Sequence, residues 1–201
     1  MDIVEKLLNR YKLTFSDDSF EKFSSILKQE DYQKDEIILE QGKISRYMYV
    51  VDKGIIRQFY YKEGRNITEH FSCEGNVATC LESVFLKEPT RLAVEAIEPS
   101  VIHLLDYEKF KNLSNQHSDI NKLYQAILEY MLIVSQQKAD SWRFESSHER
   151  YERFLIEYPE VAKRASIAHI ASYLLMATET LSRVRAVVLL FIKTKIRIFR
   201  D

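Results

Sequence analysis

The stretch of sequence that decides the fold is 166–186, SIAHIASYLLMATETLSRVRA. Apolar residues recur in it at the spacing of an α-helix, in two runs that a break near Leu175–Ala177 separates. The pattern predicts two short helices joined by a tight turn, the second of them polar and basic away from its apolar stripe. A helix of this kind suits the major groove of DNA. The apolar positions are Ile167, Ile170, Ala171 and Leu174, then Leu181 and Val184.

Length and composition limit the class of protein. The 201 residues suffice for one large domain or two small ones, and a hydrophobic content of 46% is ample for a packed core. The apolar runs are too short to span a bilayer, and the acid-containing start MDIVEKLLNRYKL predicts no secretory signal. Two cysteines, Cys73 and Cys80, are typical of a reduced, cytoplasmic protein, and no membrane partner is expected.

Charge is distributed unevenly along the chain. Residues 160–201 hold eight Lys/Arg against three Asp/Glu, a net charge of +5, whereas the remainder carries −6. A basic end on an acidic body is typical of a nucleic-acid-binding segment. On charge alone, a solvated basic face is an equally open interpretation.

The middle of the chain has the pattern of a β-structure. Between about 32 and 105, short β-branched and aromatic runs such as EIILE, RYMYVV and IIRQFYY alternate with turns, and all four glycines lie between 42 and 75. This pattern predicts a small antiparallel barrel or jelly roll. Residues 2–30 before it are predicted to be helical, with Ser16 as one helix start.

Helical spacing returns at 106–144, with Asp106 and Ser118 as predicted helix starts. The longer helix carries a stripe with coiled-coil spacing, which predicts a dimer seam; one wide core-facing surface without a dimer is the alternative. A further helix, RYERFLIEY, starts after a hinge at 146–151 and is predicted to end near Pro159. The seam comprises Ile120, Tyr124, Ile127, Met131 and Val134, and a second stripe, Leu123, Leu128 and Leu132, is predicted to pack on the barrel.

The order of these features resembles the cyclic-AMP receptor protein/fumarate-nitrate regulator (CRP/FNR) superfamily. The segment IASYLLMATETLSR carries most of the resemblance, supported by YVVDKG, FSCEGN, LESVF and VEAIEPS. The resemblance implies an α+β fold: N-terminal helices and an effector-sensing β-roll (1–117), a long dimerisation helix (118–145) and a helix-turn-helix domain (146–201). It also implies a homodimeric transcription regulator with double-stranded DNA, RNA polymerase and an unidentified small-molecule effector as partners.

The resemblance assigns DNA contacts to the second helix of the motif. Glu179 and Arg183 match positions that contact bases in the family. A glutamate can accept from the cytosine amino group, an arginine can donate two bonds to guanine, and their spacing places both on one helix face. A surface pairing of the two with each other is the alternative. The other predicted contacts, to bases or to phosphates, come from Thr178, Thr180, Ser182 and Arg185.

Two departures from the family pattern concern the same region. Leu175 stands where the family usually has glycine, so the turn is expected to differ or to be strained. The end, AVVLLFIKTKIRIFRD, lacks the glycine-centred hairpin of a wing, which is therefore expected to be reduced or absent. Its part KTKIRIF alternates like a single strand, and the apolar run 187–192 offers a surface for a partner.

The effector site also departs from the nucleotide-binding members of the family. Glu82 matches their glutamate, but Leu81 replaces the glycine before it, and Thr90-Arg91 stands in place of the Arg-Ser pair that holds the phosphate. A shift of one residue turns a strand side chain to the opposite face. Cyclic AMP is therefore not expected as a cofactor, unless the short loop 86–90 restores the arginine. The predicted pocket comprises Glu82, Ser83, Thr90, Arg91, Ser135 and Gln136.

Other chemistry finds little support in the sequence. The multiple-cysteine cluster of iron–sulfur members is absent, so Cys73 and Cys80 are interpreted as buried thiols or as a redox pair. The five histidines show no metal spacing, and no catalytic motif occurs, so no enzyme is expected. The alternative function is a degenerate effector-domain protein that acts through protein contacts without reading DNA.

Overall fold

The structure is a computed structural model that describes the backbone of residues 2–198 and the side chains as far as Val188. The chain forms two compact units, residues 1–60 with 69–135 and residues 61–68 with 136–201. The division between them falls inside the long helix, after Ser135. The domain boundaries predicted from the sequence, at residues 117 and 145, therefore stay a prediction.

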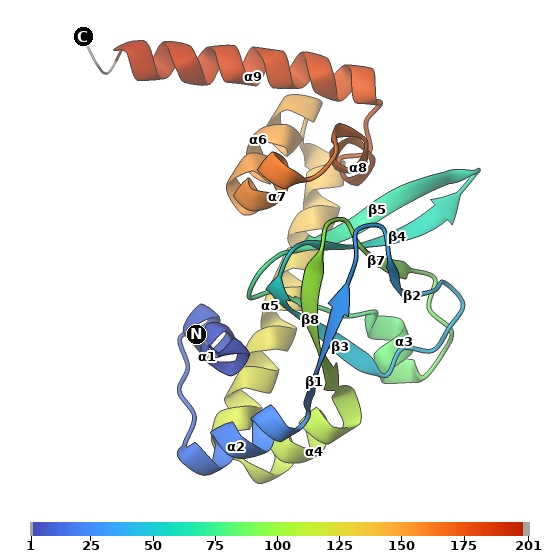
Figure 1. Cartoon of the computed structure of the whole chain (residues 1–201). Coiled ribbons are helices and arrows are strands. Elements are labelled where there is room, and N and C mark those ends of the chain that lie inside the picture. Colours follow the sequence, from blue (N-terminus) through green and yellow to red (C-terminus); the bar gives the residue numbers. More distant parts are fainter. Residues whose placement is uncertain (1, 199–201) are drawn as a thin grey trace. The chain divides into compact units, whose positions relative to one another are not determined.

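The first unit is built on a β-roll (Figure 1). The described residues form two four-stranded sheets with the strand orders β1-β8-β3-β6 and β2-β7-β4-β5. The pairs β1–β8, β3–β8, β3–β6, β2–β7 and β4–β7 are antiparallel. Most neighbours in space are distant in sequence, as in a jelly roll, which confirms the predicted architecture. The strands are β1 Leu27–Tyr32, β2 Ile37–Leu39, β3 Tyr47–Lys53, β4 Ile56–Lys62, β5 Arg65–Ser72, β6 Val77–Ala78, β7 Ala93–Ala96 and β8 Ser100–Asp106.

The helical prediction for residues 2–30 is correct only in part. Helices α1 (Ile3–Tyr11) and α2 (Asp17–Ser25) lie there, and the Ser16 hydroxyl caps α2 by accepting from the Ser19 N–H at 3.3 Å. From Leu27 onward the chain is strand β1, which pairs with β8 along its whole length. Pairing with a distant strand outweighs the local helical pattern, because that strand satisfies the backbone of β1.

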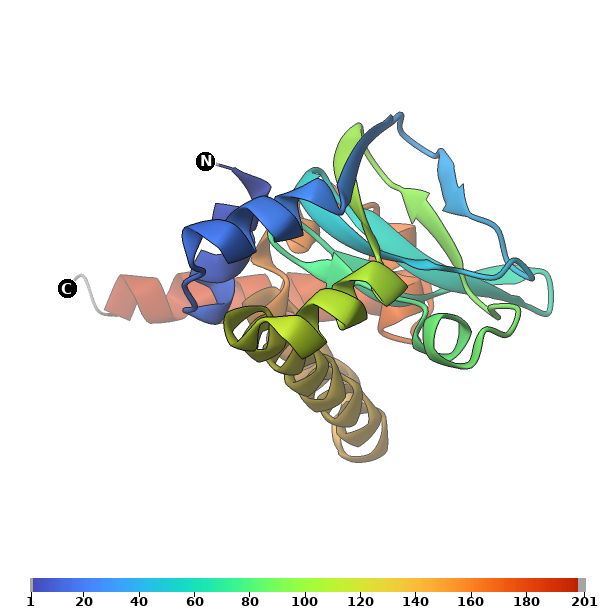
Figure 2. The same cartoon turned by 90° about the horizontal axis from the view of Figure 1, so that it is seen from below.

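Helices cover one side of the roll. Figure 2 shows α1, α2 and α4 (Tyr107–Gln116) beside the first half of α5 (Ser118–Phe144). Asp106 caps α4 as predicted, accepting from the Lys109 N–H at 3.2 Å. Phe23 and Phe110 are completely buried and meet edge to face with centroids 5.4 Å apart. A short helix, α3 (Leu81–Leu86), follows β6.

The long helix does not present the predicted seam to a partner. Ile120 and Ile127 are completely buried in the hydrophobic core of their own unit, and Tyr124 and Met131 pack partly buried against the same core. The seam prediction is wrong for Ile120 and Ile127, which lie on the inner side of α5 with apolar partners from α1 and α4. For Val134, which is half-buried, it stays a prediction. Among the apolar side chains of α5, Leu132 and Ile133 are well exposed, at 72% and 54%.

The second unit is a bundle of short helices closed by a long one. The side chains of Phe154, Tyr158 and Tyr173 form its aromatic centre, with ring centroids 5.5–5.6 Å apart. Ser146 begins the first helix with a capping box that includes Glu149. This helix ends at Glu157 and Pro159 begins the next, at a position where the missing N–H needs no partner. The helices are α6 Ser147–Glu157, α7 Pro159–Arg164, α8 Ile167–Tyr173 and α9 Thr178–Ile198.

Helix α9 replaces the strand predicted for the C-terminal segment (Figure 1). It continues through Ile198, so the strand prediction for KTKIRIF is wrong over residues 193–198, and the rest of the segment lies outside the described residues. No glycine or proline follows Pro159 to end the helix. The apolar run 187–192 lies mostly beyond the described side chains. Among the described residues, no helix is long and apolar enough to cross a membrane.

Candidate nucleic-acid interface

Helices α8 and α9 and the turn between them form the predicted two-helix motif. The Ser166 hydroxyl caps α8 by accepting from the His169 N–H at 3.1 Å. The predicted apolar positions of both helices are buried in the second unit, except Ile167, which is 37% exposed. The buried residues of the motif are Ile170, Ala171, Tyr173 and Leu174 on α8 and Leu181, Val184 and Val188 on α9, all less than 9% exposed.

The turn keeps a left-handed geometry although no glycine is present. Leu175 has a φ of 52°. The N–H groups of Leu175 and Met176 donate to the carbonyls of Ser172 and Ala171, at 3.2 and 2.9 Å, which is the Schellman arrangement that ends a helix. The strain expected at this position is confirmed, at a cost of about 1–2 kcal/mol for a residue with a Cβ. The turn therefore has the left-handed backbone conformation that glycine favours, although the residue at this position is a leucine.

All six predicted DNA-contacting residues lie in the first turns of α9. Glu179, Ser182, Arg183 and Arg185 are exposed, and the two threonines beside them are half-buried. The Arg183 Nε donates to the backbone carbonyl of Glu179 at 3.3 Å. Within the described part of the chain the two side chains form no ion pair, so the alternative of mutual pairing is not what the structure adopts. The carboxylate and the guanidinium are both free to meet a ligand.

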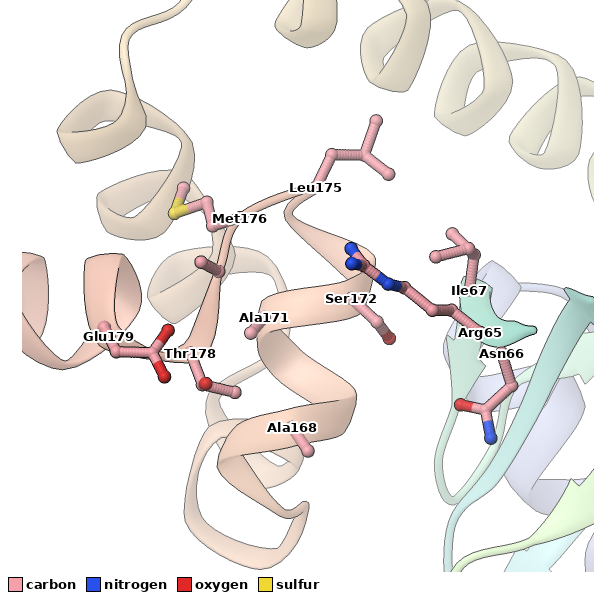
Figure 3. Close-up of a pocket in the computed structure, with 11 residues that line it drawn as sticks. Arg65, Asn66, Ile67, Ala168, Ala171, Ser172, Leu175, Met176, Thr178 and Glu179 are labelled. Carbon is pink, nitrogen blue, oxygen red and sulfur yellow. The ribbon is translucent and has the colours of Figure 1, made fainter. Parts of the chain in front are cut away.

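The second unit also includes the tip of the hairpin between β4 and β5, residues 61–68. The Thr68 N–H donates to the Ser172 hydroxyl at 3.2 Å, and the two side-chain hydroxyls lie 2.7 Å apart. A hollow of about 620 Å³ lies among this tip, α8 and the start of α9 (Figure 3). Its lining is Arg65, Asn66, Ile67, Ala168, Ala171, Ser172, Leu175, Met176, Ala177, Thr178 and Glu179.

Sequence reasoning missed the contribution of this hairpin to the interface. Residues 65–67 precede the motif by about a hundred positions, and their contact with α8 depends on tertiary structure alone. The local sequence signal was the pair Glu63-Gly64, which predicted a turn. It did not indicate which segment of the chain packs against that turn.

A buried lysine lies beneath the motif. Lys138 of α5 is 5% exposed, and its Nζ lies over the rings of Trp142 and Tyr173, at 4.7 and 5.1 Å from their centroids. Two aromatic faces stabilise the cation through their negative π-surfaces. The contact links the end of α5 to α8 inside the second unit.

The residues predicted to form the effector site differ in their exposure to solvent. Thr90 is 6% exposed, whereas Arg91 is exposed, so the loop before them does not bring the guanidinium into the roll. Ser83 is buried and its hydroxyl accepts from the Ser45 N–H at 2.8 Å. Glu82 is exposed on α3, and the remaining two candidates, Ser135 and Gln136, are exposed on α5.

Small polar side chains fill the interior of the roll beside Thr90. The Gln58 amide donates to the Thr79 carbonyl at 3.1 Å and to the Cys80 Sγ at 3.6 Å. Burial raises the pKa of the Cys80 thiol, against the effect of hydrogen bonds with Thr90 and Gln58. Burial likewise raises the pKa of Tyr49 to about 12. Both groups are therefore neutral at physiological pH. The roll also holds a buried ion pair, in which the Arg57 Nε donates to the Glu95 carboxylate at 2.5 Å.

Cys73 and Cys80 are both free thiols. The Asn76 amide donates to the Cys73 Sγ at 3.3 Å, and Cys80 is 2% exposed. The described residues include no group of three His, Cys, Asp or Glu side chains that could hold a metal ion. Cys80 is thus buried, as predicted, whereas Cys73 is only half-buried.

A β-roll, a long helix and a helix-turn-helix motif define the class of the fold. Residues 29–117 match the family profile of the cyclic nucleotide-binding domain. No curated protein sequence matches the chain.

Several solved structures have a similar fold over most of the chain. FixK2 from Bradyrhizobium japonicum is similar over 80% of this chain and 83% of its own, with 22% identity and a TM-score of 0.68. The c-di-GMP-responsive global regulator CLP from Xanthomonas campestris is 16% identical over 86% of this chain and 91% of its own, with a TM-score of 0.66. A CRP/FNR-family protein from Eubacterium rectale is 16% identical over 85% of this chain and 82% of its own, with a TM-score of 0.64. The chain therefore has the fold of the CRP/FNR regulators.

Proposed function

We propose that the chain is a DNA-binding transcription regulator of the CRP/FNR type. The observation that carries the proposal is the exposed side of α9, where Glu179 and Arg183 stand unpaired with each other on a helix whose other side is buried. A helix supported in this way can enter a major groove without losing its core contacts. The net charge of +5 over residues 160–201 favours a polyanionic partner.

The chemistry of the exposed side chains fits the edges of base pairs. Arg183 can donate two hydrogen bonds to guanine, and Glu179 can accept one from cytosine. Arg185, two residues further along, is also exposed and suits a phosphate, which positions the helix without specifying sequence. Because short recognition helices read only a few base pairs, we propose a homodimer that reads a palindrome.

The proposed homodimer uses the outer side of α5, where Leu132 and Ile133 are exposed. Such apolar side chains lose contact with water when two copies associate. Transcription regulation makes RNA polymerase a further proposed partner and the cytoplasm the proposed location. No catalytic reaction is part of the proposal.

The effector remains unidentified in this proposal, and cyclic AMP is not the proposed one. A cyclic phosphate is held by a buried guanidinium in the nucleotide-binding members that the sequence resembles, and Arg91 lies on the outside. Any effector must bind one conformation of the roll more tightly than another; a tenfold difference shifts the balance by about 1.4 kcal/mol.

The test is selection of bound duplexes from a random pool, followed by affinity measurements with Arg183→Ala. We expect an enriched palindrome, and a loss of about 1–3 kcal/mol in specific binding for the variant, because guanine recognition is removed. The control is Lys34→Ala, which removes one exposed positive charge from the roll. Unchanged specific binding by Arg183→Ala would show that α9 is not the recognition helix.

A second candidate function is a degenerate regulator that acts through protein contacts. The observations that favour it are the strained Leu175 turn and the course of α9, which forms no wing within the described residues. This candidate predicts a folded dimer that selects no DNA sequence and shows no salt-dependent binding to duplex DNA.

A further inference from the structure

The tip of the β4–β5 hairpin is a tight and well-defined turn. Strand β4 ends at Lys62 and β5 begins at Arg65, which leaves Glu63 and Gly64 as the two turn residues. Their φ angles are 52° and 73°, the positive values that a type I′ turn requires at both positions. Two cationic side chains, Lys62 and Arg65, therefore flank the tip on a rigid scaffold.

Hydrogen bonds attach this tip to the helix-turn-helix motif. Thr68 is 1% exposed and bonds through its N–H and its hydroxyl to Ser172 of α8. Buried hydrogen bonds of this kind are costly to leave unmade, so the tip and α8 hold each other in position. The contact belongs to one compact unit, which contains both segments.

Arg65 and the start of the recognition helix border the same hollow. Figure 3 shows the Arg65 side chain extending from the hairpin toward α8 near Ser172, with Glu179 and Thr178 on the opposite side. The small side chains of Ala168 and Ala171 line the hollow on α8. A duplex that meets the first turn of α9 thus approaches the guanidinium as well.

Arg65 has no anionic partner of its own. Its side chain is exposed and forms no ion pair with any residue that the structure describes, although Glu179 lines the same hollow. An exposed guanidinium with five donors suits a phosphate group, which it can bind through two parallel hydrogen bonds. Lys62 is exposed too and adds a second positive charge at the tip.

We propose that the hairpin tip is a second DNA-contacting element, in which Arg65 binds a backbone phosphate while α9 reads the bases. The inference rests on the proposed function and extends it to a segment outside the helix-turn-helix. It also supplies a contact at the flank of the recognition helix, since α9 runs straight to Ile198 and no wing hairpin follows it within the described residues.

The experiment measures the affinity of the 201-residue chain for its selected palindrome and for a random duplex across a series of salt concentrations. Arg65→Ala is expected to weaken binding to both duplexes by the same factor. It should also reduce the slope of log K against log salt by about 1.8, because each subunit of the proposed homodimer loses one phosphate contact worth about 0.9. Arg65→Glu is expected to weaken both further. Arg65→Lys should retain the slope, because a lysine still neutralises the phosphate.

Lys34→Ala removes a positive charge from the roll and is expected to leave the slope unchanged. An unchanged slope for Arg65→Ala, or tighter binding, overturns the inference; tighter binding would mean that the tip obstructs DNA. If Arg183→Ala loses specific binding while Arg65→Ala behaves like the wild type, the inference fails and the proposed function stands. If the wild type binds no duplex in a salt-dependent manner, both fail.

Discussion

The exposed side of α5 allows the proposed dimer to be tested without disturbing the fold. Leu132 is 72% exposed in the single chain, whereas Ile127, five residues earlier on the same helix, is completely buried in its own unit. A change at Leu132 therefore acts on association, and a change at Ile127 acts on folding. The perturbation is Leu132→Glu, which replaces an apolar contact with a charge.

The magnitude follows from the area that a dimer would remove from water. Complete burial of a leucine side chain contributes about 1.5–3 kcal/mol, so the exposed 72% of Leu132 corresponds to about 1–2 kcal/mol. A symmetric dimer contains this contact twice, so its loss amounts to about 2–4 kcal/mol. The dimer dissociation constant should rise about 30- to 700-fold.

Sedimentation equilibrium measures the dissociation constant, and thermal unfolding monitored by circular dichroism shows that the variant still folds. Ile127→Ala is the matched control on the same helix: it should lower the free energy of unfolding by about 2–5 kcal/mol through the cavity it leaves. A Leu132→Glu protein that associates as tightly as the wild type would refute the assignment of the outer side of α5 to the dimer.

Two further predictions concern stability. Burial alone raises the pKa of Asp119, but hydrogen bonds from Ser16 and Ser19 outweigh it and lower the pKa to about 2. A carboxylate with a lowered pKa stabilises the fold above about pH 4, and this stabilisation is lost as the pH falls through 2. In urea-unfolding measurements, Asp119→Asn should therefore make the free energy of unfolding less dependent on pH in this range. The contribution of Asp119 is at most about 2.4 kcal/mol, and about 1 kcal/mol once solvent screening is included. Leu175→Gly should raise the free energy of unfolding by about 0.5–1 kcal/mol in the same measurement, because relief of the left-handed strain exceeds the added flexibility of the unfolded chain; a lower free energy of unfolding would contradict the strain.

Local patterns were sufficient for much of the architecture. Turn residues between β-branched runs predicted the roll, and capping residues such as Ser16 and Asp106 predicted helix starts that the structure has. The helix-turn-helix was readable for the same reason: its buried stripe and its turn lie within some twenty consecutive residues. The strain at Leu175 was also predictable, since it depends only on the chirality of one residue in a required backbone conformation.

Other features depended on partners that lie far away in the chain. The segment 27–32 has no strong strand pattern, and only its pairing with β8 makes it a strand. The alternation in KTKIRIF resembled a strand, yet without a partner strand or a helix-ending residue the segment continues α9. Local sequence cannot distinguish these outcomes, because a strand is stabilised by hydrogen bonds to another segment and a helix by its own.

The apolar spacing in α5 shows the same division. Its period fixes that one stripe of the helix is buried, but a core stripe and a dimer seam have the same period. The packing of α1 and α4 against Ile120 and Ile127 decided which stripe faces inward. Likewise, the residue types of α9 are the basis of the proposed DNA contact, whereas the hydrogen bonds between Thr68 and Ser172 hold the hairpin with Arg65 against α8. Periodicity is local, and the identity of the neighbour that covers a surface is a property of the folded chain.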